Sequence, residues 1–586
     1  MDVVIAGGGL AGLCLARQLR RELPELGVTV VERVARPLPE ATHKVGESSV
    51  ELASHYFGEV LGLRSYLEER HLIKNGLRFF PGGGELPLAE RTEIGPPQLP
   101  IVPSFQIDRG RFENDLRAMC EKDGVTLIEG VAVRAIEPGQ IEADQPHRVI
   151  LEDGRELTSR WLVDATGRRR MLSRKLGLGE SSGHHGHAAW FRVERRLDVD
   201  HLVPREDEDW HKRDLDNIRW LSTSHLMGEG YWVWLIPLST GHTSVGIVVH
   251  GDVHAFDTLR TAEAARTWLE TFEPELLRTL GDTVFADFRV AKDYSYTASR
   301  CFSPERWSLV GEAGLFVDPF YSPGSDFIAM ANGFTTELIK ADVSGEPADA
   351  FEERVEFMDW FYRRLALIST LTYRDAAAAY GEPRVLAAKI YWDNFNYWAF
   401  VCQYWFQDLY KLPIAEQRAF LPVAERFAVL NERAQKLFSE WAQRAKDAPE
   451  RRHVVMPPIP SMLANLHLDL EKAMTPDETV AYMSEKADLA EELLTEMLLR
   501  AVLELGGEAG ASLTDALGVS EWTLRGVEPR LQAERGGRRG RRKRISRLVR
   551  DLERTIGAAS PAEPAETALD DAVAAALPWV APAPAE

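Results

Sequence analysis

A glycine-rich turn near the start of the chain constrains its fold more than any other segment. The pattern G-x-G-x-x-G spans residues 7–12, between an apolar run at 2–6 and a helical spacing at 13–23. A second apolar run at 28–32 completes a strand–helix–strand unit. In such a unit the helix N-terminus faces phosphate groups. We therefore predict that the chain begins with a Rossmann-type dinucleotide-binding fold.

The residues expected to bind the dinucleotide lie in this turn and at the end of the second strand. Glu32 ends that strand, where a carboxylate can accept hydrogen bonds from ribose hydroxyls. The predicted contacts in this unit are Gly7, Gly9, Leu10, Ala11, Gly12, Glu32 and Arg33.

The composition is that of a large globular protein and argues against several classes of partner. Of 586 residues, 45% are hydrophobic and 27% are charged, and the net charge is −21. An acidic protein repels phosphate backbones, so a nucleic-acid partner is not expected. No apolar run is long enough to span a membrane. Four scattered cysteines without metal-ligand spacing indicate reduced thiols, no metal site and a cytoplasmic location.

The fold class predicted from the pattern of elements is α/β, with an antiparallel sheet inserted into the dinucleotide-binding part and a mainly helical C-terminal region. A basic run at 535–550 is read as a solvated helix face, or as a contact with an acidic partner. The expected divisions, in chain order, are 1–180 (dinucleotide-binding, first part), 181–300 (substrate-side sheet), 301–345 (dinucleotide-binding, last part), 346–505 (helical), 506–557 (basic helical) and 558–586 (disordered).

Two further motifs favour FAD over NAD. Residues 163–168 resemble the second flavin motif of the FAD monooxygenase superfamily, and residues 308–319 resemble its third, where an acid binds the ribityl or phosphate part. The third motif usually has Asp after its glycine. This chain has Glu312, so Asp318 is the better candidate ligand. Arg109 also matches the superfamily, although a salt bridge at a helix start is the alternative. The motifs add Asp164, Gly311, Asp318 and Arg109 to the predicted cofactor contacts.

The segment Trp232-Val-Trp234-Leu-Ile236-Pro237 resembles the signature of the flavin-dependent halogenases, the tryptophan-halogenase-like family. Two indoles on one face of a strand, closed by a proline, form a rigid wall beside the flavin, although core packing alone explains such a pattern too. The resemblance covers about residues 1–400. It implies an enzyme of secondary metabolism, such as antibiotic biosynthesis, that uses halide, oxygen and reduced FAD from a flavin reductase. The hypohalous acid it makes then reaches an aromatic substrate in a separate site.

Val45-Gly46-Glu47-Ser48 resembles the strap that this family lays over the flavin. The resemblance makes Val45 and Ser48 cofactor contacts and places Glu47 at the active site. The alternative for Glu47 is a helix-capping pair with Ser48.

Residues 72–79 resemble the family segment that carries the catalytic lysine, and Lys74 is the matching position. An amine in an apolar tunnel loses its preference for the charged form. It can then hydrogen-bond hypohalous acid or be N-halogenated. A surface lysine is the alternative, and Lys44 is a competing candidate.

Residues 318–325 align with the family loop that binds halide, and the implied halide contacts are Ser322, Pro323, Gly324 and Ser325. Proline has no N–H, so one expected donor is missing. This departure favours a second hypothesis, a monooxygenase or oxidase on the same scaffold that uses no halide. Phe320 and Tyr321 are expected to line the tunnel. Because tryptophan-specific members carry glutamate at the position of Tyr321, phenols, pyrroles or carrier-tethered aromatics are favoured as substrates.

A dense aromatic stretch between residues 391 and 406 lies in the helical region. Core packing is the default interpretation, and a substrate pocket or a partner groove is the alternative. A third hypothesis is a flavin-binding protein that works only within a biosynthetic complex, through its helical C-terminus.

Overall fold

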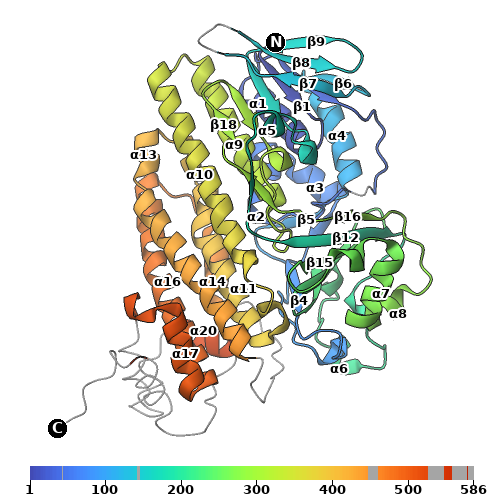
Figure 1. The fold of residues 1–586 in the computed structure, drawn as a ribbon, viewed down its shortest axis with the longest axis vertical. Coiled ribbons are helices and arrows are strands. Elements are labelled where there is room, and N and C mark those ends of the chain that lie inside the picture. The colour runs from blue at the N-terminus through green and yellow to red at the C-terminus, as the bar shows by residue number, and fades with distance from the viewer. Residues whose placement is uncertain (42–43, 141–144, 446–459, 526–546, 557–576, 578–586) are drawn as a thin grey trace, which may run out of the picture.

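Two large sheets and a flank of long helices make up the fold in this computed structural model (Figure 1). The structure describes residues 1–41, 44–140, 145–445, 460–525, 547–556 and 577. The predicted disordered tail, apart from residue 577, and most of the basic run lie outside the described residues. The parallel sheet and the inserted sheet lie one above the other in Figure 1, and the helical flank runs along both.

The first sheet has the strand order expected of a Rossmann-type fold, with all pairings parallel except that of its edge strand β18. Its strands, in spatial order, are β18 (Phe302–Ser303), β19 (Trp307–Leu309), β10 (Trp161–Asp164), β1 (Val3–Ala6), β2 (Val28–Glu32) and β6 (Thr126–Glu129). From β1 the chain moves to β2 on one side, and it returns later to place β10 on the other side of β1. A crevice therefore forms at the carboxyl end of β1. Helices α1 (Leu10–Glu22), α4 (Arg109–Lys122) and α9 (Gly324–Val343) cover the sheet.

The glycine turn after β1 is dictated by close backbone approach. Gly7 has φ of +115°, and a Cβ on it would lie 2.2 Å from the carbonyl oxygen of Ala165. Only glycine fits there, because a side chain would push β1 and β10 apart. The turn therefore delivers the chain directly into the first turn of α1 at the crevice.

Along the chain, most of the second sheet is inserted between strands β10 and β18 of the first sheet. It is antiparallel except for one pairing. Its strands, in spatial order, are β16 (Arg289–Ala291), β12 (Gly186–Val193), β15 (Thr243–His250), β14 (Tyr231–Pro237), β13 (Thr223–Gly228) and β4 (Leu77–Phe80). Strand β4 pairs parallel to β13 and comes from outside the segment 181–300. Along β14, Trp232 and Trp234 face the body of the protein, whereas Val233 and Leu235 pack in a separate core beneath α7 (Ala262–Phe272) and α8 (Pro274–Leu280).

Smaller pairings complete the β-structure. They are β3 (Leu72–Lys74) with β5 (Ser104–Gln106), β7 (Val133–Glu137) with β8 (His147–Leu151) and β9 (Glu156–Ser159), and β11 (Gly179–Ser181) with β17 (Tyr296–Ala298). The short helices here are α2 (Glu51–His55), which continues as a π-helical turn η1 (Tyr56–Val60), α3 (Arg64–Arg70), α5 (Met171–Lys175) and α6 (Glu208–His211).

The helical flank begins with α10 and includes a second π-helical turn. Its helices are α10 (Ala348–Arg374), α11 (Pro383–Asn396), the π-turn η9 (Tyr397–Val401), α12 (Cys402–Phe406), α13 (Ile414–Arg418), α14 (Leu421–Ala445), α15 (Ser461–Asp469), α16 (Pro476–Leu505), α17 (Gly507–Leu517) and α20 (Arg547–Ile556). Helices α14 and α16 pack along each other, and α11 packs on both. The predicted fold class, an α/β protein with an inserted sheet and a helical C-terminal region, is confirmed.

Two further observations concern membranes and metals. No helix in the described ranges is long and apolar enough to cross a bilayer. Nor do the described residues contain a cluster of three or more His, Cys, Asp or Glu side chains arranged to hold a metal ion.

We predict that Glu273→Ala destabilises the fold by about 3 kcal/mol, because it leaves a buried guanidinium without its counter-charge. Arg91 donates to both carboxylate oxygens of Glu273 at 3.0 and 2.8 Å, and both side chains are 1% exposed. Urea unfolding followed by circular dichroism measures the change. Glu208→Ala is the control, since it breaks an exposed pair with Lys212. Equal midpoints for the two variants would mean that the buried pair between Arg91 and the α7–α8 junction adds no more stability than an exposed pair.

Candidate active site

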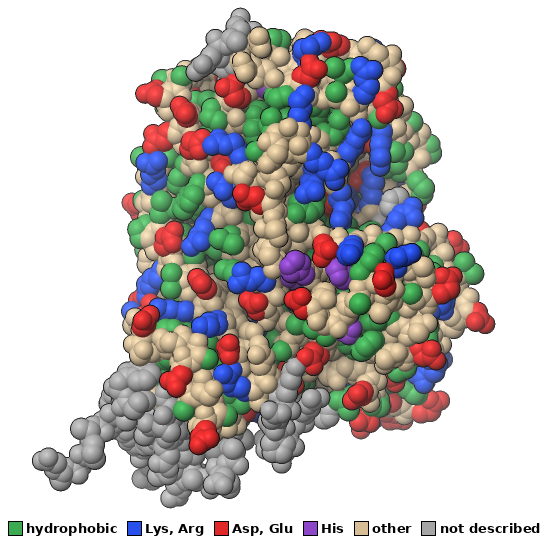
Figure 2. Space-filling view, viewed as in Figure 1, with side chains coloured by type: hydrophobic (Ala, Val, Ile, Leu, Met, Phe, Trp, Pro, Cys, Tyr) green, Lys and Arg blue, Asp and Glu red, His purple; other side chains and the backbone are tan. Residues whose placement is uncertain are grey.

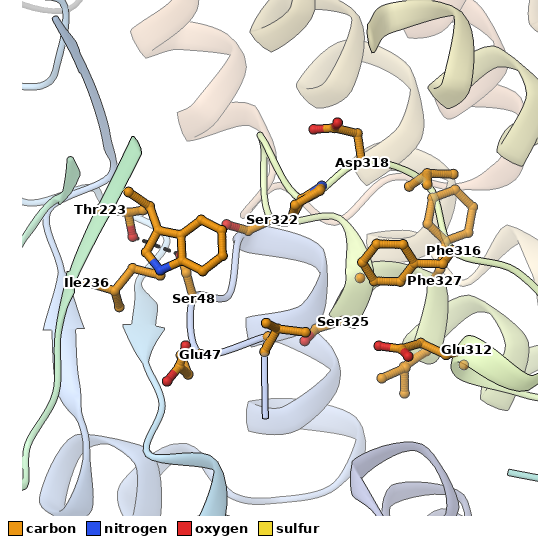
Figure 3. A pocket seen from close by; sticks show the side chains of 18 of the residues that line it. Glu47, Ser48, Thr223, Ile236, Glu312, Phe316, Asp318, Ser322, Ser325 and Phe327 are labelled. Carbon is orange, nitrogen blue, oxygen red and sulfur yellow. Dashed lines mark hydrogen bonds between the residues drawn. The ribbon is translucent and has the colours of Figure 1, made fainter. Parts of the chain in front are cut away.

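A cavity of about 890 Å³, with space open to solvent included, lies where the two sheets meet the N-terminus of α9. Three sides bring together segments that are far apart in the sequence: the predicted strap at 45–48, the indoles of β14, and the loop 311–319. Figure 3 shows Glu47 and Glu312 on opposite sides of this cavity, with Ser325 between them. We call it the first cavity.

The predicted dinucleotide contacts gather at the crevice beyond β1. The backbone N–H of Gly8 donates to Oε2 of Glu32 at 2.8 Å, which aims that carboxylate at the turn. Gly9 precedes α1 and has open space around it. Leu10 and Ala11 form the first turn of α1, whose amides lack helical partners, and Arg33 is exposed beside Glu32. Basic side chains gather over this half of the molecule in Figure 2, although the whole chain is acidic.

Arg109 holds the strap against the first cavity. Its guanidinium donates to the carbonyl of Val45 and, at 2.8 Å, to Glu113 on the next turn of α4. Gly46 has φ of +89°, and a Cβ on it would lie 2.8 Å from the same guanidinium. The strap can pass so closely only because residue 46 is glycine. Arg109 thus makes the salt bridge considered as its alternative and also lines the cavity.

Glu47 ties the strap to the inserted sheet. Its Oε1 accepts from Arg192 at 3.0 Å, and its Oε2 accepts from the hydroxyl of Ser244 at 2.9 Å. Burial raises the pKa of Glu47, and the guanidinium of Arg192 opposes that shift. Sequence reasoning missed Arg192, which lies on β12, far from the strap in sequence. The neighbouring Ser48 shares a hydrogen bond of 2.9 Å with the hydroxyl of Thr223 (Figure 3).

The two predicted aspartates are engaged within the protein. Asp164 accepts from the backbone N–H groups of Thr166 at 2.9 Å and Leu172 at 2.7 Å, and it does not line the first cavity. Asp318 lines the cavity, but its carboxylate accepts from His184 at 2.8 Å and from the hydroxyl of Tyr294.

Glu312 has the more open carboxylate. It lines the first cavity beside Gly311, and among the described residues none donates a hydrogen bond to its side chain. Burial raises its pKa, and the nearby guanidiniums of Arg168 and Arg109 oppose the shift. The signal for this residue was its place directly after the motif glycine, where the family carries an acid. Gly311 itself packs against Ala11 of α1.

An aromatic wall closes the inner side of the first cavity. Trp232 and Trp234 line it with Ile236, and the indole N–H of Trp234 donates to Ser244 at 3.1 Å. Phe320, which is fully buried, contacts Trp232 with ring centres 5.4 Å apart. On its other side Phe320 meets the rings of Phe79, His225, Tyr321 and Tyr380. Pro237 ends the strand and lines neither cavity.

A second cavity lies beyond this wall. Its volume is about 2030 Å³ when space open to solvent is included. Phe79, Tyr321 and Phe327 border it on the side of the wall, and Phe327 borders the first cavity as well. Much of the remaining lining comes from α10, α11, the π-turn η9 and α15. Tyr391, Tyr397 and Trp398, from the aromatic stretch noted in the sequence, are among these residues, whereas Trp392 and Phe395 are core.

Lys74 faces the second cavity at the end of β3. It is 1% exposed, and its ammonium donates to the carbonyl of Ser49 at 2.8 Å. Burial lowers the pKa of Lys74 to about 7, and Glu51 and Asp326 oppose that shift. The competing candidate, Lys44, pairs with Glu113 and lines neither cavity.

The first turn of α9 separates the two cavities. Ser322 has φ of +61°, Pro323 is the residue before the helix, and Gly324 begins it. The carbonyl of Pro323 accepts from Phe327 at 3.0 Å, so the amides of Gly324 and Ser325 precede the helical hydrogen bonds. Ser322, Gly324 and Ser325 line the first cavity, whereas Pro323 lines the second.

Comparisons with known proteins agree in sequence and in fold. The tryptophan halogenase family model matches residues 89–368. The flavin-dependent halogenase chlA of Dictyostelium discoideum is 27% identical, over 70% of this chain and 72% of its own. A brominase of 1H-pyrrole-2-carbonyl groups on a peptidyl-carrier protein, from Pseudoalteromonas luteoviolacea, is 26% identical, over 61% and 79%.

Solved structures share the fold at lower identity. The crystal structure of halogenase PltM superposes with a TM-score of 0.59 at 16% identity, over 85% of this chain and 96% of that one. The myxobacterial chondrochloren halogenase CndH gives a TM-score of 0.51 at 24% identity, over 64% and 83%. The sequence relative chlA and the PltM structure each cover most of this chain, and the family model covers residues 89–368, so the chain is similar to flavin-dependent halogenases in sequence and in fold.

Proposed function

We propose that the chain is an FAD-dependent halogenase that uses reduced FAD, oxygen and halide to halogenate an electron-rich aromatic compound. The observation that carries this proposal is the position of Lys74. A buried amine with a pKa of about 7 lies in one cavity, while the flavin-type motifs converge on another, and an aromatic wall stands between them. Such an arrangement suits an oxidant made on one side and used on the other.

The residues present fit FAD. At the crevice the amides of Leu10 and Ala11 suit the pyrophosphate, and Glu32 suits a ribose. In the first cavity, residue 46 is a glycine, so the strap backbone has no side chain there to keep the flat flavin ring away. The carboxylate of Glu312 is free to accept hydrogen bonds from the ribityl hydroxyls. Reduced FAD, when bound, supplies the two electrons that activate oxygen. We therefore assign the ribityl contact to Glu312 rather than to Asp318, whose carboxylate is engaged by His184.

The N-terminus of α9 supplies what a halide ion needs. Gly324 and Ser325 line the first cavity at the positive end of a 20-residue helix, where the first amides have no helical partners. Pro323 was expected to remove a donor. It stands just before the helix and borders the other cavity, which supports the amides of Gly324 and Ser325 as the halide donors.

Lys74 acts on the hypohalous acid that reaches the second cavity. In the neutral amine, the nitrogen lone pair attacks the halogen. The N–X bond forms as the O–X bond breaks, and the departing hydroxide takes a proton from nitrogen to leave as water. Protonated Lys74 has no free lone pair and acts only as a hydrogen-bond donor. Because the pKa of Lys74 is lowered to about 7, the reactive neutral form becomes the main one as pH rises above about 7.

The substrate side fits an aromatic compound. Aromatic side chains line the second cavity, among them Phe79, Tyr373 and Trp398. Because residue 321 is tyrosine, its side chain offers no carboxylate to an indole N–H. Its hydroxyl donates to Asp393 at 2.7 Å. We propose a phenol, a pyrrole or a carrier-tethered aromatic as substrate, as with the carrier-protein brominase above. A cytoplasmic flavin reductase would supply the reduced FAD.

Replacing Lys74 with Ala should abolish halogenation and leave FAD binding intact, because the amine lies across the wall from the first cavity. Liquid chromatography with mass spectrometry on a panel of phenols and pyrroles measures the product. Flavin absorbance measures binding. Lys44→Ala is the matched control and should halogenate normally. Halogenated product from the Lys74→Ala variant would disprove the assignment.

Bromide or chloride should alter the rate at which flavin is reoxidised when the enzyme carrying reduced FAD is mixed with oxygen. The reason is that a halide held at Gly324 and Ser325 would react with the oxygen that reduced FAD activates. Stopped-flow absorbance, with and without halide, measures this. Hydroxylated product and a rate indifferent to halide would instead support the monooxygenase alternative.

Glu312→Ala should weaken FAD binding about 10-fold or more, because a hydrogen bond to a charged group contributes about 1.5–3 kcal/mol. Asp318→Asn should weaken it less, since that side chain is held by His184. Titration of the apoprotein with FAD, followed by flavin fluorescence, compares the two. A larger loss from Asp318→Asn would return the ribityl contact to Asp318.

A further inference from the structure

A contact between a histidine and a glutamate joins the helical flank to α2, whose first residue borders the same cavity as Lys74. Nε2 of His467, on α15, lies 3.2 Å from Oε1 of Glu51, the first residue of α2. The side chains are 6% and 12% exposed. His467, Glu51 and Lys74 all line the second cavity. A residue from a region without any recognised motif therefore contacts the acid whose charge acts most on the predicted catalytic amine.

Charged groups face one another from several elements here. The basic residues that line the second cavity are Lys74 and His467, and the acidic ones are Glu51, Asp326 and Asp393. Glu51 and Asp326 are the two groups whose charge acts on Lys74. Asp393 is compensated elsewhere, by Lys389 at 2.9 Å.

Several other described neighbours of Asp326 and Glu51 carry no positive charge. Asp326 accepts from the hydroxyl of Tyr397 at 2.8 Å and from the backbone N–H of Ala53 at 2.9 Å. Cys402 also lies near Glu51 and Asp326, and burial keeps its thiol protonated by raising its pKa. Within the described part of the cavity lining, His467 is thus the basic side chain other than Lys74 that contacts Glu51.

We propose that His467 controls the protonation of Lys74 by neutralising Glu51, which makes α15 a positioning element of the active site. When His467 is protonated, Glu51 is compensated and exerts little pull on a proton at Lys74. Without that charge, Glu51 favours the ammonium form of Lys74. The effect on turnover rests on the proposed function of Lys74, whereas the coupling of charges does not.

The signs of the expected changes are opposite for the two partners. His467→Gln keeps a donor near Glu51 but removes the charge, so the pKa of Lys74 should rise. Glu51→Gln keeps an acceptor near His467 but removes the negative charge, so the pKa of Lys74 should fall. Opposite charges within a few ångströms shift a pKa by about one unit or more. A merely structural role of the pair would move Lys74 the same way in both variants, towards its ordinary value.

Carbamylation by cyanate tests the coupling without flavin, halide or substrate. Isocyanic acid is small and adds only to the neutral amine, so the labelling rate divided by the isocyanic acid concentration at each pH reports the titration of Lys74. The full-length protein is labelled across a pH series, and the Lys74 peptide is quantified by mass spectrometry. Lys44, outside both cavities, is the internal control, and its profile should not change between variants.

The expected result is a wild-type midpoint near 7 that rises by about one pH unit in His467→Gln and falls in Glu51→Gln. Midpoints that move in the same direction, or that do not move, would overturn the proposal. Halogenation measured over the same pH range should show the same opposite displacements of its rising limb. Opposite labelling shifts without any halogenation would uphold the coupling and refute the proposed function instead.

Discussion

The carboxylate of Asp326 holds together the two helix starts on which the site depends. It lies in the first turn of α9 and accepts from the backbone N–H of Ala53, in the first turn of α2. The chain just before α2 supplies the carbonyl of Ser49 that receives the ammonium of Lys74. Gly324 and Ser325 of the same turn line the first cavity. One buried contact therefore sets the spacing between the amine of Lys74 and the start of α9, and burial raises the pKa of Asp326 to about 7.

Features set by local sequence could be predicted, and those that join distant segments could not. The glycine turn, the strand–helix–strand unit and the two indoles on one face of β14 follow from spacing alone, because backbone geometry imposes those periods. Nothing in the sequence around Glu47 points to Arg192, and nothing around Glu51 points to His467. Each pair forms only when the inserted sheet or the helical flank packs against the first sheet. The addition of β4 to the inserted sheet is a pairing of the same long-range kind.

The interpretation of Pro323 changes once its position relative to α9 is known. In the sequence it appears as a lost hydrogen-bond donor. In the structure it precedes α9, where proline costs little because the first amides have no helical partner. Glu312 and Asp318 are both acids in one motif, and the sequence alone does not distinguish their roles. The motif does not reveal that His184 and Tyr294 already occupy the carboxylate of Asp318.

The π-turn η9 has a consequence for how this cavity can change. A π-turn accommodates one residue more than an α-turn, and here the consecutive residues 396, 397 and 398 all border the second cavity. Removing one residue from this turn would restore the α-helical repeat and rotate everything after it by about 100°. The lining of the second cavity would then be made by different side chains, although no side chain had been substituted. Chain length within a single turn is thus itself a determinant of the shape and chemistry of this cavity.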